Sequence, residues 1–232
     1  MRRLLLPILA LLLAACAAPT EDAAPPTSIR IGLSYAAQAQ RAALLACIPT
    51  DGAVQIELDL VLANSVDVAE YDLLIRLGEA HPMPAFAVQL GQDQVLAAIN
   101  PANPLRELDA SQLAHLFSGR VSNWEDLGGE PGEVRVWIGL EGDETRQLFR
   151  QALMQGAEFS GGTRLAASPE IMAAAVEADA NAIGLLPASL MPEGLRGITT
   201  GISAPVLALA SSEPEGTLRD IIACLQRAEE ND

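Results

Sequence analysis

The sequence predicts an α/β fold in which mainly parallel sheets are flanked by helices. Strand-like and helix-like runs alternate from residue 29 to the end of the chain, a pattern typical of parallel α/β domains. Half of the 232 residues are hydrophobic, which suffices for a sizeable core. Because the sequence shows no internal repeat, we expect one large domain or two small ones.

The expected elements follow in chain order. A buried strand is expected at 29–33, and Ser34 is a suitable N-cap for an alanine-rich helix at 35–46. The broken apolar run at 85–99 indicates a pair of strands. Further strands are expected at 54–60, 71–77, 134–138, 182–187 and 204–210, and further helices at 111–117, from Glu144 onward, at 168–178 and at 216–227.

Composition and motifs exclude several functions. The formal net charge is -16 and all 14 basic residues are arginine, so the chain has no P-loop or Schiff-base lysine, and nucleic acid is not an expected partner. His81 and His115 are far apart and belong to no zinc-binding pattern, and no G-x-S-x-G nucleophile motif occurs. We therefore expect no metal, no cofactor and no catalysis.

The N-terminus indicates export. Two arginines and an apolar run at 4–13 precede the sequence LAAC, which ends at Cys16; this order is typical of a secretory signal. LAAC also resembles the bacterial lipoprotein cleavage box, in which the cysteine is lipidated. An ordinary signal cut after one of the alanines is the alternative. Residues 17–28 are small, polar and proline-bearing, which predicts a flexible tether that holds an extracytoplasmic domain at a membrane.

Two cysteines, Cys47 and Cys224, remain once Cys16 is assigned to the anchor. An even number of cysteines in an exported domain favours a disulfide. Each cysteine lies in an apolar, helix-like run, so two separate buried thiols are the alternative.

Three carboxylates stand at the expected start of the helix at Glu144. The stretch GLEGDETRQLF places Glu141, Asp143 and Glu144 directly after a strand-like run. A helix start attracts anions, but its dipole contributes only about 0.3–2 kcal/mol, whereas a carboxylate about 4 Å from a phosphate oxygen costs on the order of 4 kcal/mol at an effective dielectric near 20. Asp143 therefore either caps the helix itself or helps to select a ligand that is not a free anion.

The stretch 95–149 resembles the phosphate-type solute-binding proteins of ABC transporters. The resemblance is carried by INPANPL at 99–105, by LAHLFSGRVSNWEDLGG at 113–129 and by the helix start Thr-Arg-x-x-Phe at 145–149. It extends over about residues 29–227 through ANAIG and SAPV further along the chain.

This resemblance implies a two-lobed type II periplasmic-binding-protein fold with a ligand cleft between the lobes. Lobe I would comprise 29–99 and 201–232, and lobe II would comprise 100–200, after the signal segment 1–16 and the tether. Both Cys47 and Cys224 would then lie in lobe I, which fits a disulfide between them.

The expected ligand loop departs from the family pattern. Asp143, Glu144 and Thr145 stand where the family carries Ser-Gly-Thr, and Gly139 stands where it carries an arginine. In lobe I the turn before the first helix keeps a hydroxyl at Ser34, which either caps the helix or contacts the ligand, and it is followed by Tyr35.

Further candidates are Asp72, which either sets selectivity or pairs with Arg76, and two arginines. Arg76 and Arg146 are the cations that would answer an oxyanion, although Arg146 is equally suited to a solvated helix surface. The predicted ligand set is thus Ser34, Tyr35, Asp72, Arg76, Asp143, Glu144, Thr145 and Arg146.

The resemblance implies a monomeric solute-binding lipoprotein that catches phosphate or another oxyanion and delivers it to an ABC permease. The altered loop leaves open a second hypothesis, in which the scaffold is kept but transport is lost, giving a surface sensor or interaction domain. A neighbouring permease would favour the first hypothesis, and a neighbouring sensor kinase would favour the second.

Overall fold

The computed structural model of the protein describes residues 27–50, 52 and 54–229. The expected signal segment, Cys16 and most of the expected tether lie outside these residues. Strand β1 (Thr27–Ser34) begins two residues before the expected start, so Thr27 and Ser28 belong to the sheet rather than to the tether.

A sheet of eight strands runs through the molecule in the order β2-β1-β3-β8-β4-β7-β5-β6. The outer pairs β1–β2, β1–β3, β5–β6 and β5–β7 are parallel, and the central pairs β3–β8, β4–β8 and β4–β7 are antiparallel. The remaining strands are β2 (Val54–Val61), β3 (Leu73–Leu77), β4 (Phe86–Ile99), β5 (Arg135–Gly139), β6 (Arg164–Ala166), β7 (Ala182–Pro187) and β8 (Arg196–Ala210). The expected α/β class is therefore confirmed, with an antiparallel centre.

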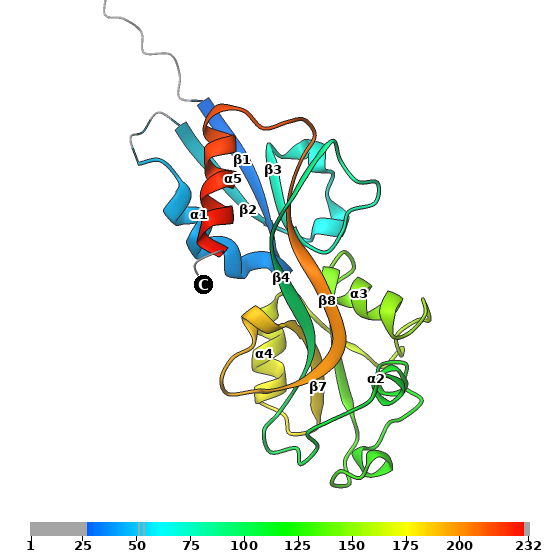
Figure 1. The fold of residues 1–232 in the computed structure, drawn as a ribbon. Helices are drawn as coiled ribbons and strands as arrows, with labels where there is room; N and C mark the ends of the chain where they lie inside the picture. The colour runs from blue at the N-terminus through cyan, green and yellow to red at the C-terminus, as the bar shows by residue number, and fades with distance from the viewer. Residues whose placement is uncertain (1–26, 51, 53, 230–232) are drawn as a thin grey trace, which may run out of the picture.

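Strands β4 and β8 join the two halves of the molecule. One half holds β1, β2 and β3, and the other holds β5, β6 and β7 (Figure 1). Strands β4 and β8 pair with each other from Phe86–Ala210 to Ile99–Arg196 and pass from one half into the other (Figure 1). The prediction of two strands at 85–99 is wrong, because β4 absorbs its interruptions as register shifts at Gln89/Gly91 and Val95/Leu96. The lobe boundaries at 99 and 201 stay a prediction.

Helices cover the sheet in both halves (Figure 1). The first expected helix is divided into a 3-10 helix, η1 (Tyr35–Gln40), and α1 (Arg41–Cys47). The longer helices are α2 (Ala110–Phe117), α3 (Glu144–Ala152), α4 (Pro169–Glu177) and α5 (Gly216–Glu229). Short 3-10 helices lie at η2 (Ala63–Ser65), η3 (Val68–Glu70), η4 (Trp124–Leu127) and η5 (Ala188–Leu190). Helices α1 and α5 belong to the half that holds β1, and α2, α3 and α4 belong to the other half (Figure 1).

A disulfide joins the two ends of the described chain. Cys47 at the end of α1 and Cys224 in α5 form an S–S bond, with their Cα atoms 5.7 Å apart, a separation within the usual range for a disulfide. Figure 1 shows α1 and α5 side by side in the half that contains β1. The bond thus ties the last helix to the first.

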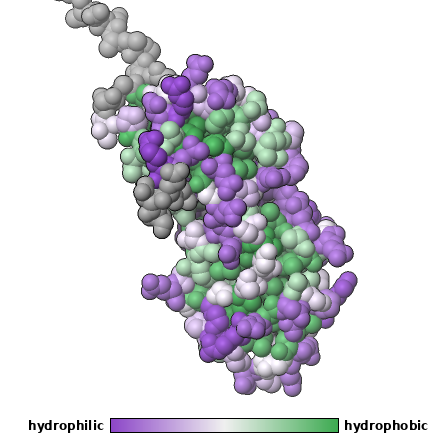
Figure 2. Space-filling view, in the orientation of Figure 1, coloured by the Kyte–Doolittle hydropathy of each residue, from purple (hydrophilic) through white to green (hydrophobic). Residues whose placement is uncertain are grey.

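A continuous hydrophobic core extends through both halves. Trp124, Phe117 and Phe149 are among its largest fully buried side chains, and the rings of Phe117 and Phe149 lie 4.5 Å apart. Figure 2 shows hydrophilic residues over much of the visible face, with hydrophobic residues between them in both halves. Among the described residues, none of the helices combines the length and the hydropathy that crossing a membrane requires.

Candidate functional site

The starts of several helices converge where the two halves meet. Ser34 caps η1, Asp143 caps α3 and Ser168 caps α4, each through a side-chain oxygen that accepts a backbone N–H. The cavity between the α3 and α4 starts has a volume of only about 10 Å³. This is close to the volume, roughly 10–15 Å³, that a cavity needs to hold a single water molecule. Its lining includes Ala36, Gly139, Asp143, Thr145, Ser168 and Pro187.

Asp143 fills the start of α3. Its Oδ1 accepts the backbone N–H of Arg146 at 2.9 Å and the hydroxyl of Thr145, and the residue is only 8% exposed. Burial raises the pKa of Asp143, while the hydrogen bonds from Thr145 and Arg146 lower it. The protein thus supplies its own carboxylate at the helix start.

Gly139 makes room for this carboxylate. A Cβ at position 139 would lie 2.5 Å from Cγ and 2.8 Å from Oδ1 of Asp143, distances that no real side chain tolerates. The space beside position 139 is therefore occupied by the carboxyl group of Asp143.

Glu144 reaches from α3 into the other half. Its Oε1 accepts the backbone N–H of Leu77 on β3 at 3.4 Å, and its Oε2 is buried without a hydrogen-bond partner among the described residues. Glu144 is only 1% exposed. Burial and the nearby charge of Asp143 raise the pKa of Glu144 to about 7, although a hydrogen bond from Ser34 and the charge of Arg76 lower it.

Arg76 is the buried cation of the site. It lies on β3 and is 5% exposed, and its Nη2 donates to Oδ1 of Asn64 at 2.8 Å. Its Nε has no hydrogen-bond partner among the described residues. Burial lowers the pKa of Arg76 and the charge of Glu144 raises it. One cation and one carboxylate, contributed by different halves, therefore each retain a buried hydrogen-bonding atom without a partner among the described residues.

Arg76 and Glu144 line the same cavity, whose volume is about 250 Å³. It lies between α3, the end of β3 and the middle of β8. The polar and ionisable residues in its lining are Asn64, Arg76, Glu79, His81, Glu144, Gln147, Gln151 and Ser203. This cavity is larger than the space at the filled helix starts, and its volume lies just below the range of about 300–1,000 Å³ that is typical of ligand pockets.

The halves also contact each other directly beside this cavity. The backbone N–H of Asn64 donates to the carbonyl of Gly142 at 3.2 Å, and the hydroxyl of Ser65 donates to the carbonyl of Glu141 at 3.5 Å. On the opposite side of the helix starts, Nε2 of Gln38 donates to the carboxylate of Glu170. The structure therefore describes the two halves in contact.

Arg146 is engaged within its own half rather than at the Arg76–Glu144 cavity. Its Nη2 pairs with Glu141 at 2.7 Å and its Nη1 donates to the carbonyl of Gly139 at 3.3 Å. Because the Glu141 side chain is 81% exposed, this ion pair contributes little stability. Glu141, one of the three acids at the helix start, therefore has Arg146 as its ion-pair partner.

Asp72 does not join the other predicted residues. It precedes β3, its side chain is exposed, and its Oδ2 accepts the backbone N–H of Arg30 at 2.7 Å. The alternative in which Asp72 pairs with Arg76 is wrong, because Arg76 lies near the other end of β3 and donates to Asn64; a ligand role for Asp72 stays a prediction. Tyr35 is the half-buried first residue of η1.

Several lining residues were not anticipated from the sequence, among them Asn64, Gln147 and Ser203. Asn64 lies just beyond the carboxyl end of β2, and ligand sites in α/β proteins favour the carboxyl ends of parallel strands. Applied to the expected strand at 54–60, that rule indicates Asn64 as a candidate from the sequence. Gln147 and Ser203 carry no comparable local pattern.

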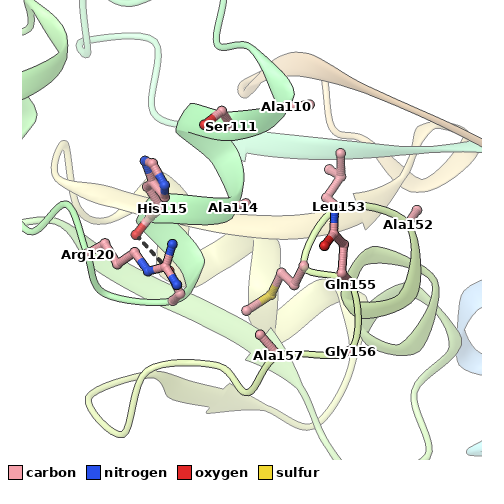
Figure 3. Close-up of a pocket in the computed structure, with 12 residues that line it drawn as sticks. Ala110, Ser111, Ala114, His115, Arg120, Ala152, Leu153, Gln155, Gly156 and Ala157 are labelled. Carbon is pink, nitrogen blue, oxygen red and sulfur yellow. Dashed lines mark hydrogen bonds between the residues drawn. The ribbon is translucent and has the colours of Figure 1, made fainter.

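A second hollow, of about 810 Å³, lies between α2 and the segment that follows α3. Figure 3 shows it lined largely by small side chains, with the backbone N–H of Arg120 donating to the carbonyl of His115 at 2.9 Å. It brings together none of the predicted ligand residues. In the described part of the chain, no group of three or more His, Cys, Asp or Glu side chains is arranged to hold a metal ion.

The fold matches that of the type II periplasmic binding proteins. A family model described as a PBP superfamily domain matches residues 61–211, which is more than half of the chain. The chain therefore belongs to this family.

Solved structures of similar fold include two phosphate-transport proteins. A protein assigned as a phosphate ABC transporter substrate-binding protein from Clostridium perfringens, with phosphate bound, has a TM-score of 0.76 at 17% identity, over 86% of this chain and 93% of that chain. An ABC-type phosphate transport receptor from Vibrio cholerae has a TM-score of 0.68 at 17% identity, over 88% of this chain and 96% of that chain.

Two further comparisons extend this range. The regulatory domain of CcmR from Synechocystis PCC6803, in complex with 2-PG, has a TM-score of 0.64 at 13% identity, over 88% of this chain and 98% of that chain. The phosphate-binding protein PstS of Bacillus subtilis is 29% identical over 66 residues, which make up 28% of this chain and 22% of PstS. This chain thus matches about a fifth of the length of that curated relative.

Proposed function

We propose that this protein is an extracytoplasmic solute-binding protein of an ABC importer, held at a membrane by a lipid on Cys16. It binds a small solute between its two halves, presents it to a permease and catalyses no reaction. Family membership, the phosphate-transport proteins of similar fold and the secretory N-terminus support this role.

One observation carries the proposal. Arg76 and Glu144 come from different halves, are almost fully buried and line one cavity, yet each retains a buried polar atom without a partner among the described residues. Such atoms are costly unless a ligand or water satisfies them. A solute that bonds to both would favour contact between the halves.

Phosphate or another oxyanion is the solute class expected from the sequence and is tested first. The mature chain from Ala17, with its disulfide intact, is titrated calorimetrically with phosphate, sulfate, molybdate and tungstate, and native mass spectrometry identifies any solute that copurifies. We expect one bound small solute per monomer, and at least tenfold weaker binding after Arg76→Ala. Arg120→Ala, in the hollow of Figure 3, is the matched control.

Importer function also requires a permease. Crosslinking in intact cells should join the domain to a transmembrane permease subunit. If no solute copurifies with the protein and no permease is crosslinked to it, the importer proposal is contradicted.

A sensor or interaction domain without transport is the second candidate. It is favoured by the about 10 Å³ left at the helix starts, together with the regulatory domain that shares the fold. Crosslinking to a sensor kinase in place of a permease would support it.

A further inference from the structure

We infer that the cavity lined by Arg76 and Glu144 takes a small zwitterionic solute, an amino-acid-like molecule whose ammonium group meets Glu144 and whose carboxylate meets Arg76, rather than a free oxyanion. This inference rests on the proposed function, because it names the solute class of the same site.

The unpartnered hydrogen-bonding atoms of Arg76 and Glu144 are complementary to a zwitterion. Oε2 of Glu144 is an acceptor without a donor, and Nε of Arg76 is a donor without an acceptor, among the described residues. A fully deprotonated oxyanion such as sulfate supplies acceptors for Arg76 but no donor for Glu144, and phosphate supplies a hydroxyl donor but brings negative charge to the carboxylate. An ammonium group and a carboxylate on one small molecule supply both partners.

The charges around the cavity also disfavour an oxyanion. Glu144 and Glu79 line it together with a single arginine, Arg76, and the neighbouring carboxylate of Asp143 acts electrostatically on Glu144. Asp143 already accepts the hydrogen bonds at the start of α3, so that helix start offers an incoming anion little compensation.

The size of the cavity limits the solute. About 250 Å³ corresponds to the liquid volume of roughly eight water molecules at about 30 Å³ each. Small amino acids such as alanine and threonine fall well within that size.

Proton linkage separates the two solute classes. The groups that act on Glu144 are Asp143, Arg76 and Ser34, and Glu79 and His81 line the same cavity. Because the pKa of Glu144 lies at about 7, an ammonium group that favours its ionised form releases a proton on binding near pH 7. Sulfate, an oxyanion that does not titrate near pH 7, favours the protonated form of Glu144, so its binding takes up a proton.

The experiment is calorimetry of the mature chain at pH 7 in two buffers with different ionisation enthalpies. The probes are glycine, alanine, threonine, asparagine, sulfate and inorganic phosphate. We expect binding of at least one small amino acid with proton release, and at least tenfold loss of that binding after Glu144→Gln. Arg76→Lys, which keeps the charge, should lose less affinity than Arg76→Gln.

The controls keep the result interpretable. Glu193→Gln, at an exposed glutamate, should leave affinity unchanged, and thermal melting of each variant reports whether it is folded. Binding of phosphate or sulfate that is tighter than the binding of every amino acid would overturn the inference while leaving the importer proposal intact. Failure of every amino acid to bind would also overturn it. Amino-acid binding without a copurifying solute or a permease crosslink would uphold the inference and count against the importer.

Discussion

The carboxyl carbon of Asp143 lies 2.5 Å from the place that a Cβ on Gly139 would occupy. The two residues are four positions apart, at the end of β5 and the start of α3, and the absence of a side chain at one allows the burial of the other. The strand end and the helix cap therefore form one packing unit.

Gly139→Ala should lower the free energy of unfolding by about 1–3 kcal/mol, because the added methyl group collides with the buried carboxylate. Urea denaturation measures the loss. Gly161→Ala is the matched control, since a Cβ there meets nothing within 4 Å.

Replacing Asp143 as well should remove this collision. In the double variant Gly139→Ala/Asp143→Ser, the cost of the alanine should fall by more than half, because serine is shorter and still caps the helix. Strict additivity of the two single substitutions would contradict the proposed packing.

Glu144 should make stability depend on pH. Its pKa is raised from 4.5 to about 7 in the folded protein, so the folded state holds the proton more strongly than the unfolded state. The contribution is fully present below about pH 4.5 and is lost as the pH rises to about 7, by about 3 kcal/mol in total.

Glu144→Gln should remove this part of the pH dependence. Chemical denaturation between pH 4.5 and 8 measures it, and Glu193→Gln, at an exposed position, should retain it. An unchanged profile in Glu144→Gln would show that other groups cause the dependence.

Ser34→Ala should raise the pKa of Glu144 further, since the hydrogen bond from Ser34 lowers it. The same substitution removes the N-cap of η1 and should cost about 1 kcal/mol of stability. The midpoint of the pH profile reports the first effect, and the denaturation midpoint at fixed pH reports the second. Ser111→Ala, on the exposed face of α2, is expected to change neither midpoint appreciably.

The disulfide should contribute substantially to stability. Cys47 and Cys224 are 177 positions apart, so the bond constrains nearly the whole unfolded domain. The double variant Cys47→Ser/Cys224→Ser should lose about 2–5 kcal/mol. Thermal melting with and without reductant should show the same loss in the wild type and no effect of reductant in the variant.

Local signals predicted the helix starts well. Ser34 and Asp143 cap the helices that follow, capping being one of the two roles left open for each, because a short polar side chain before a helix acts over only three residues. Ser168, expected as the first residue of its helix, is the N-cap instead. The ends of the long strands were harder to predict from the sequence. The stretch of β4 was predicted to form two strands, and β8 begins at Arg196 rather than at 204. Pairing with a distant strand, rather than local composition, decides where such strands end.

The sequence by itself determined the α/β class, the family resemblance and the presence of acids at the start of α3, because each follows from residues close together in the chain. Only the tertiary structure assigned those acids separate roles. Glu141 pairs with Arg146, Asp143 fills the space left by Gly139, and Glu144 crosses to Leu77. The physical reason is that burial and partners from the other half, which local sequence does not encode, decide whether a carboxylate caps a helix, pairs with a cation or remains open to a ligand.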